Sequence, residues 1–325
     1  MMERKFLFTF IIAAILGSMM LFALQKDGGQ LEFVWGKQWG TAAMEVVTDI
    51  ALDGQGHIYI AGVTAGNLFG QNQGGDDIFI VKLDSDGEML WVKQLGSAKD
   101  KEGCRIGVDG EGNIYLLTET EGDWFGKNLG VKDIILLKLS SSGEILWRKR
   151  IGTEKDELGT AIAIGSNHVY ITGITRGNLF GEYRNEKWGG YEGVLAKYDL
   201  NGNLVLGKQF SGGENLEAIA VDSQSNICAA GTTEDEATNE VVLFLAKFNS
   251  DGNLIWRRVF PYEDEIIISI SVDKSSNVYM AGNVAIYSDE DESKAIPIPD
   301  AFISKYRGEN EERVWSKRFR TQGDV

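Results

Sequence analysis

Acidic residues recur in the segments that lead into one strand of a repeated unit, and carboxylates gathered there could hold a divalent cation. Asp100, Asp156 and Glu157 are the members of this set for which a metal site is expected. Calcium is the candidate ion because it takes carboxylate oxygens as ligands. A solvated acidic rim accounts for the same residues without any ion and is the favoured interpretation. Apart from calcium, the sequence predicts no cofactor.

Aromatic residues on variable loops give a second candidate chemistry, the binding of a ligand. Phe69, Phe125 and Phe180 recur at one position of the repeat, which predicts packing inside the protein. Other aromatic residues break the repeat and lie beside Asn, Glu and Arg, a combination that suits contact with a protein or a carbohydrate. Ordinary loop variation is the alternative. The binding candidates are Trp124, Tyr183, Arg184, Trp188 and Tyr191.

Signals for catalysis are weak. His57 and His168 are the only histidines, and both take a turn position that is Asn in the other units. A histidine-based triad or zinc site needs partners that are not evident. The segments Asp84–Gly87 and Asn249–Gly252 begin like calcium loops but lack the closing Glu, so they are predicted to be β-turns. No catalytic residue is assigned.

Composition excludes some partners. The chain has 325 residues and a formal net charge of −16, which argues against nucleic acid because phosphate backbones require a cationic surface. Cys104 and Cys228 are the only cysteines, and they indicate no disulfide framework.

The N-terminal residues 1–24 resemble an export signal. Arg4 and Lys5 precede an uncharged run from Phe6 to Leu24, as in a secretory signal peptide or an N-terminal membrane anchor. Residues 25–32 are expected to be a linker. The rest of the chain is then extracytoplasmic, whether secreted, periplasmic or membrane-anchored. It would meet a membrane only through this segment, if the segment is not cleaved.

A repeat organises the remainder of the chain. A Trp, or Leu in one unit, recurs at intervals of 56, 56, 59, 50 and 59 residues. Repeats of this length with several strands each are typical of β-propeller blades. The landmarks are Trp35, Trp91, Trp147, Leu206, Trp256 and Trp315.

Each unit reads as four short strands. In the first unit they are predicted at 48–53, 57–62, 77–84 and 89–95, with tight Asp-Gly type turns after the first and third strands and long loops elsewhere. We therefore expect an all-β protein, a β-propeller of four-stranded antiparallel blades over residues 33–325. It would have five full blades plus an extra N-terminal strand at 33–39, an incomplete six-bladed ring being the alternative. One Lys per blade, exemplified by Lys82 and Lys247, is expected to face solvent or to extend its charged end to water.

The units resemble the bacterial SBBP β-propeller repeat. The resemblance rests on IALDGQGHIYIAGVT and GGDDIFIVKLDSDGEMLWVKQLG and on their copies along residues 33–325. It implies a secreted or surface-attached bacterial protein and transfers no catalytic residues. LDSDGEMLW is also loosely similar to the blade hairpins of pyrroloquinoline-quinone enzymes, which generally use calcium.

The sequence therefore favours an exported, non-catalytic β-propeller that acts as a binding or scaffold module at the cell surface or elsewhere outside the cytoplasm. The expected partner is a protein or carbohydrate ligand at the face that carries the long loops. The alternative is a propeller enzyme, either a quinoprotein dehydrogenase or a carbohydrate-active lyase or hydrolase. An enzyme would require acid–base groups converging on one pocket.

Overall fold

The computed structural model describes residues 8–15, 18–27, 30–99, 101–184, 190–210, 214–235, 237–238, 240–260, 265–284 and 300–319. Within these ranges the chain consists of β-strands joined by turns and loops, with no helix. The predicted all-β class is therefore confirmed.

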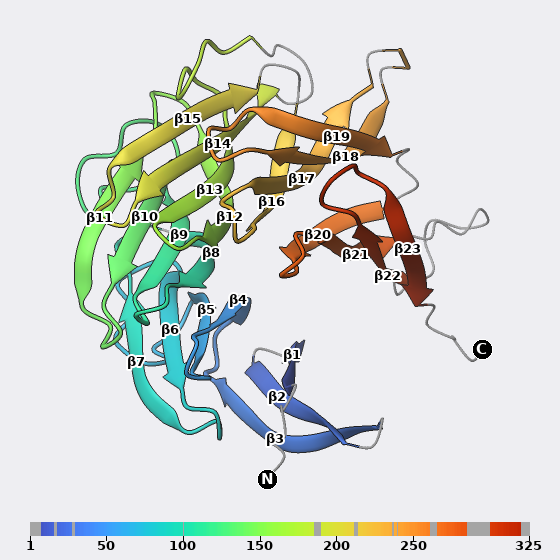
Figure 1. Cartoon of the computed structure of the whole chain (residues 1–325). Helices are drawn as coiled ribbons and strands as arrows, with labels where there is room; N and C mark the ends of the chain where they lie inside the picture. Colours follow the sequence, from blue (N-terminus) through green and yellow to red (C-terminus); the bar gives the residue numbers. More distant parts are fainter. Residues whose placement is uncertain are drawn as a thin grey trace, which may run out of the picture. The chain divides into compact units, whose positions relative to one another are not determined.

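Five four-stranded antiparallel sheets form the predicted blades (Figure 1). Each strand pairs with the next one along the chain, which is the topology of an up-and-down propeller blade. The first two blades are β4 (Glu45–Leu52), β5 (Ile58–Thr64), β6 (Asp77–Leu83) and β7 (Met89–Leu95), then β8 (Lys101–Val108), β9 (Ile114–Thr120), β10 (Asp133–Leu139) and β11 (Ile145–Ile151). The third is β12 (Glu157–Ile164), β13 (His168–Thr175), β14 (Glu192–Asp199) and β15 (Leu204–Phe210). The last two are β16 (Asn215–Val221), β17 (Ile227–Glu234), β18 (Val241–Phe248) and β19 (Leu254–Phe260), then β20 (Glu265–Val272), β21 (Val278–Val284), β22 (Asp300–Tyr306) and β23 (Arg313–Phe319).

A three-stranded sheet precedes the blades and comprises β1 (Phe8–Ile15), β2 (Ser18–Asp27) and β3 (Gln30–Gly40). Strand β3 contains residues 33–39, so the extra N-terminal strand is confirmed. Strands β1 and β2 fall largely within the segment predicted as a signal peptide or anchor. The described residues include no helix long and apolar enough to cross a membrane. The assignment of residues 1–24 to an export signal stays a prediction.

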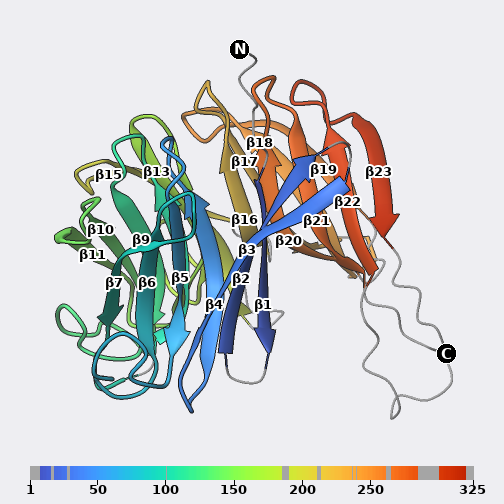
Figure 2. The ribbon, with the colours of Figure 1, turned by 90° about the horizontal axis from the view of Figure 1, so that it is seen from below.

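The chain divides into two compact units, residues 1–151 and 152–325. In the first unit the first strands of the two blades, β4 and β8, contact each other. Figure 2 shows β7, β6, β5 and β4 next to one another in that order. In the second unit β16 contacts both β12 and β20. Buried side chains of neighbouring blades form shared apolar clusters within each unit.

The recurring Trp explains why the repeat needs a neighbour. Lys82 lies opposite Trp91 in the β6–β7 hairpin, and Lys247 lies opposite Trp256 in β18–β19. The Trp91 indole N–H donates to the carbonyl of Ser141 in the next blade, at 3.0 Å. A lone blade would leave such indole rings in water, whereas the next blade covers Trp91 in part and Trp256 almost completely.

In three blades the recurring Lys does not face solvent as expected, whereas Lys138 and Lys305 are half-exposed. The side chains of Lys82, Lys197 and Lys247 are buried. The ammonium group of Lys82 lies 5.1 Å from the centre of the Tyr59 ring, and that of Lys197 donates to the carbonyl of Ser250 in the next blade. Because Lys82 also donates to the Ser141 carbonyl of the next blade at 3.4 Å, both residues tie adjacent blades together.

The tight turns form as predicted. In most of them, an Asp or Asn side chain accepts hydrogen bonds from backbone N–H groups that follow it in the chain. Asp84 and Asn249 each accept two backbone N–H groups, so the calcium-like segments are confirmed as β-turns. His57 belongs to such a turn, with its Nδ1 atom 2.7 Å from Asp53 Oδ2. The His168 ring packs edge-on against Tyr170.

Because of the aspartates in the tight turns, we expect the folded protein to lose stability in acid. The pKa values of Asp53 and Asp222 lie below the ordinary range. Burial raises both, but hydrogen bonds from His57 to Asp53, and from Asn226 and Lys247 to Asp222, outweigh it. A carboxyl group whose folded pKa is depressed stabilises the protein above its unfolded pKa, about 3.9, and loses this effect as the pH falls through the folded value.

We therefore expect the urea midpoint of the full chain to drop between about pH 5 and about pH 3, as followed by tryptophan fluorescence. Asp222→Asn, which has no carboxyl group to titrate, should show a shallower dependence. Equal slopes for the two proteins would contradict the role assigned to Asp222.

Candidate functional site

The aromatic residues predicted to bind a ligand separate into a buried and an accessible group. Trp124 follows β9, is only 6 % exposed and packs on Phe125 with ring centres 4.4 Å apart. Its ring belongs to the core and is not available to a ligand, which corrects the expectation for this residue. Trp188 lies outside the described residues. Tyr183, Arg184 and Tyr191 lie on the connection between β13 and β14.

A groove of about 320 Å³ lies beside this connection. Its lining comes from the segment before β12 and from the segment after β13. The lining residues are Thr153, Glu154, Lys155, Arg176, Gly177, Asn178 and Tyr183. Small-molecule sites range from about 300 to about 1,000 Å³, so the groove is at the small end of that range.

Backbone and side-chain hydrogen bonds hold both walls of the groove. The buried carboxylate of Glu157 accepts from the Thr153 N–H at 2.7 Å, the Thr153 hydroxyl at 2.6 Å and the Thr175 hydroxyl at 2.7 Å. The Gln209 side chain accepts from the backbone N–H of Leu179 and Phe180. The loop that carries Tyr183 is thereby fixed to the sheet.

Arg176 is the most engaged cation of the groove. Its guanidinium group lies 4.2 Å from the centre of the Tyr191 ring and 3.4 Å from Asp156 Oδ2. The Tyr183 hydroxyl donates to the Gly190 carbonyl at 2.8 Å, and Arg184 pairs with Glu182 in water. Of the predicted residues, Tyr183 therefore lines the groove and Tyr191 contacts its Arg176, whereas neither Tyr191 nor Arg184 is among the lining residues.

Two groups of the groove are free to bind a ligand. Lys155 and Asn178 are exposed, and within the described residues neither the Lys155 ammonium group nor the Asn178 amide nitrogen has a hydrogen-bond partner. These polar groups beside a tyrosine ring can bind a hydroxylated or anionic ligand. Glu154 is the one carboxylate among the lining residues and is exposed, so this lining does not supply a paired acid and base.

Two of the acidic residues predicted to hold calcium make contacts with other side chains of the protein. Glu157 is buried and takes three hydrogen bonds, while Asp156 faces Arg176. Asp100 lies outside the described residues. Among the residues that the structure describes, no three His, Cys, Asp or Glu side chains converge on a point. The calcium site stays a prediction.

Sequence reasoning missed Arg176, Lys155 and Asn178. Arg176 had a usable signal, because it stands where the first two blades have Ala65 and Glu121 between the same Thr and Gly. Lys155 and Asn178 had none, since exposed polar residues on loops are ordinary.

Comparison with known proteins supports the fold and leaves the family open. No family model matches the chain. It is similar to a crystallised protein of unknown function from Bacteroides caccae, with 13 % identity over 92 % of this chain and 89 % of that one and a TM-score of 0.50. The β-propeller fold is supported by this match. Membership of the SBBP repeat family stays a prediction.

Two further matches carry names. The chain is 25 % identical over 174 residues to the regulatory protein FlaEY of Caulobacter vibrioides, which covers 49 % of this chain and 18 % of that protein. The chain thus spans less than a fifth of its curated relative. A lignostilbene dioxygenase from Pseudomonas brassicacearum is similar with 10 % identity over 97 % of this chain and 69 % of that one, at a TM-score of 0.49.

Proposed function

We propose that the chain is an exported, non-catalytic β-propeller that binds a carbohydrate carrying carboxylate groups in the groove beside the β13–β14 connection. The observation that carries the proposal is the groove itself, where Arg176, Lys155 and Asn178 lie beside Tyr183. Export is supported by the basic and apolar N-terminal segment, residues 1–24.

The chemistry of the groove favours an acidic sugar over a neutral one. A pyranose ring offers hydroxyl groups to Asn178, and one apolar face to the ring of Tyr183. Its carboxylate would complement the exposed ammonium group of Lys155, and Arg176, which already pairs with Asp156, would add a second cation beside it. A protein ligand is the alternative occupant of the groove, and the experiment must distinguish it from a carbohydrate.

The proposal is tested by isothermal titration of the full chain with trigalacturonate, with maltotriose as a neutral trisaccharide. We expect binding of the acidic sugar and at least tenfold weaker binding of the neutral one, because a hydrogen bond to a charged group is worth about 1.5–3 kcal/mol. Lys155→Ala and Tyr183→Ala should each weaken trigalacturonate binding about tenfold.

Arg307→Ala is the matched control. Arg307 pairs with Glu312 at 2.8 Å on the β22–β23 turn, where both side chains are exposed and not part of the groove. This variant should bind as the unmodified chain does. Failure of trigalacturonate to bind, or equal binding by all the variants, would refute a carbohydrate site in this groove.

A further inference from the structure

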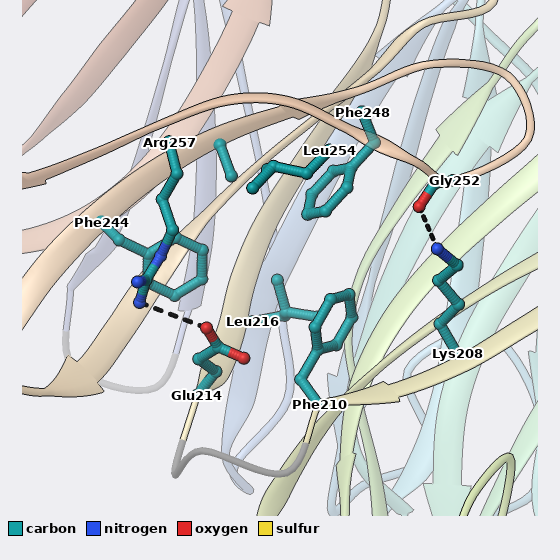
Figure 3. Close-up of a pocket in the computed structure, with 10 residues that line it drawn as sticks. Lys208, Phe210, Glu214, Leu216, Phe244, Phe248, Gly252, Leu254 and Arg257 are labelled. Atoms are coloured by element: carbon teal, nitrogen blue, oxygen red, sulfur yellow. Dashed lines mark hydrogen bonds and ion pairs between the residues drawn. The ribbon is translucent and has the colours of Figure 1, made fainter.

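A second pocket, separate from the groove, lies between the third and fourth blades (Figure 3). Its volume is about 220 Å³, and its walls come from β15, β16, β18 and β19. Three phenylalanine rings, Phe210, Phe244 and Phe248, face it together with Leu216 and Leu254. Phe210 and Phe248 lie 5.8 Å apart, between ring centres.

The pocket has an identifiable origin in the repeat. The fourth and fifth blades meet through the same kind of aromatic pair, Phe260 and Tyr306, at 5.6 Å. In that interface Trp256 is buried in the apolar cluster. The third blade has Leu206 at the position of Trp256. Leu206 lies next to Gly252 on the pocket wall, so close that a methyl group added to Gly252 would be 2.7 Å from Leu206 Cδ2. The indole that helps to fill one interface is therefore missing from the other.

A second small residue enlarges the same space. Ala246 lines the pocket and directly precedes the recurring Lys. The first two blades carry Val81 and Leu137 at this position, and both are buried in the core. A larger apolar residue is thus compatible with the blade at this point, and Ala246 leaves room for something else.

Charged groups stand at two sides of the apolar space. Arg257 lies over the Phe244 ring, 5.4 Å from its centre, and pairs with Glu214 at 3.2 Å. Lys208 donates to the carbonyl of Gly252 on the opposite side (Figure 3). Two cations against one carboxylate leave the pocket with a local positive charge, in a chain whose net charge is −16.

We infer that this pocket binds a small aromatic carboxylate, with its ring among Phe210, Phe244 and Phe248 and its carboxylate at Arg257. An apolar cavity of about 150 Å³ stays dry and binds benzene, so 220 Å³ accepts one ring with a short acidic substituent. Phenyl rings on the walls favour a ring in the ligand through edge and offset contacts. Arg257 recognises a carboxylate with two parallel N–H donors.

Glu214 sets the affinity, because it competes with the ligand for Arg257. Burial raises the pKa of Glu214, and Arg257 opposes that rise. Glu214→Gln should therefore tighten binding of the carboxylate several-fold, whereas Arg257→Gln should weaken it about tenfold. Neither change should alter the affinity for an uncharged ligand of the same shape by more than about twofold.

The test is titration of the full chain with 3-phenylpropionate, and with 3-phenyl-1-propanol as its uncharged match. Leu206→Trp and Ala246→Leu restore residues that other blades carry at the same positions, and they should fill the pocket. We expect both to abolish binding while keeping or raising the urea midpoint, since filling a cavity stabilises a core. The urea midpoint thereby shows whether binding is lost because the pocket is filled or because the variant is unfolded.

Three results would overturn the inference: no binding of 3-phenylpropionate to the unmodified chain at millimolar concentration, unchanged binding by folded Leu206→Trp and Ala246→Leu, or Glu214→Gln binding no more tightly than the unmodified chain. The pocket does not share residues with the groove proposed for carbohydrate. Trigalacturonate binding should therefore be the same in these variants, so that the two sites succeed or fail independently.

Discussion

Replacing Arg150 by Met is expected to destabilise the chain by about 3–5 kcal/mol, the range for breaking a buried ion pair by removing one partner. Arg150 is on β11 and lies 2.6 Å from Asp133, whose side chain is completely buried. Met preserves most of the volume but leaves that carboxylate without its cation. Because folded domains are stable by only about 5–15 kcal/mol, the loss is a large share of the total.

Arg150 also holds the loop between β9 and β10. Its guanidinium group donates to the backbone carbonyls of Gly122, Trp124 and Gly126. These carbonyls lose a shared donor in the variant, so the loop around the buried Trp124 should open as well. Hydrogen exchange at residues 122–128 should rise by more than global unfolding accounts for.

Arg150→Gln is the matched control, because the first and third blades have Gln94 and Gln209 at this position. Gln94 donates to Asp77 at 2.9 Å and to the Gly66 carbonyl at 3.0 Å, doing with an amide what Arg150 does with a guanidinium group. Urea unfolding should place Arg150→Gln between the unmodified chain and Arg150→Met. A Met variant as stable as the Gln variant would show that Asp133 does not depend on this cation.

Lys247→Met should have a comparable effect in the second unit, about 3–5 kcal/mol. Lys247 is 4 % exposed and lies 3.0 Å from Asp222, which is also buried. Its ammonium group donates to the Gly308 carbonyl of the next blade at 3.2 Å. Met matches the length of the aliphatic chain, so the loss reports the orphaned carboxylate and carbonyl rather than a cavity.

Lys305→Met is the control for this pair. Lys305 and Asp273 form the equivalent contact at 3.2 Å, but both side chains are partly open to water. Water can replace the lost partner there, so the urea midpoint should move far less than in Lys247→Met. Equal shifts in the two variants would mean that burial does not set the strength of the pair.

The architecture could be predicted because local sequence patterns repeat from blade to blade. Asp-Gly and Asn-Gly turns, alternating apolar runs and the spaced Trp residues fix strands and register within a few residues. Strand β7, for example, was expected at 89–95 and is found at Met89–Leu95. The repeat also exposed its own exception, Leu206, as the unit without Trp.

The exposure of individual side chains could not be predicted from the sequence. Trp124 broke the repeat and sat on a loop, yet Phe125 and the carbonyl contact with Arg150 bring it into the core. The recurring Lys looks like an exposed strand residue until the next blade is placed over it, as with Lys82. Both outcomes depend in part on hydrogen bonds between distant segments, from Arg150 to Trp124 and from Lys82 to Ser141, which no local pattern contains.

The central claim is that the groove beside the β13–β14 connection binds a carbohydrate and does not transform it. Saturation-transfer NMR of trigalacturonate with the full chain tests both parts in one sample. We expect transfer to the sugar protons, its loss in Lys155→Ala, and a sugar spectrum unchanged after a day. Absence of transfer, transfer that persists in Lys155→Ala, or new signals from cleaved or unsaturated sugar would contradict the claim.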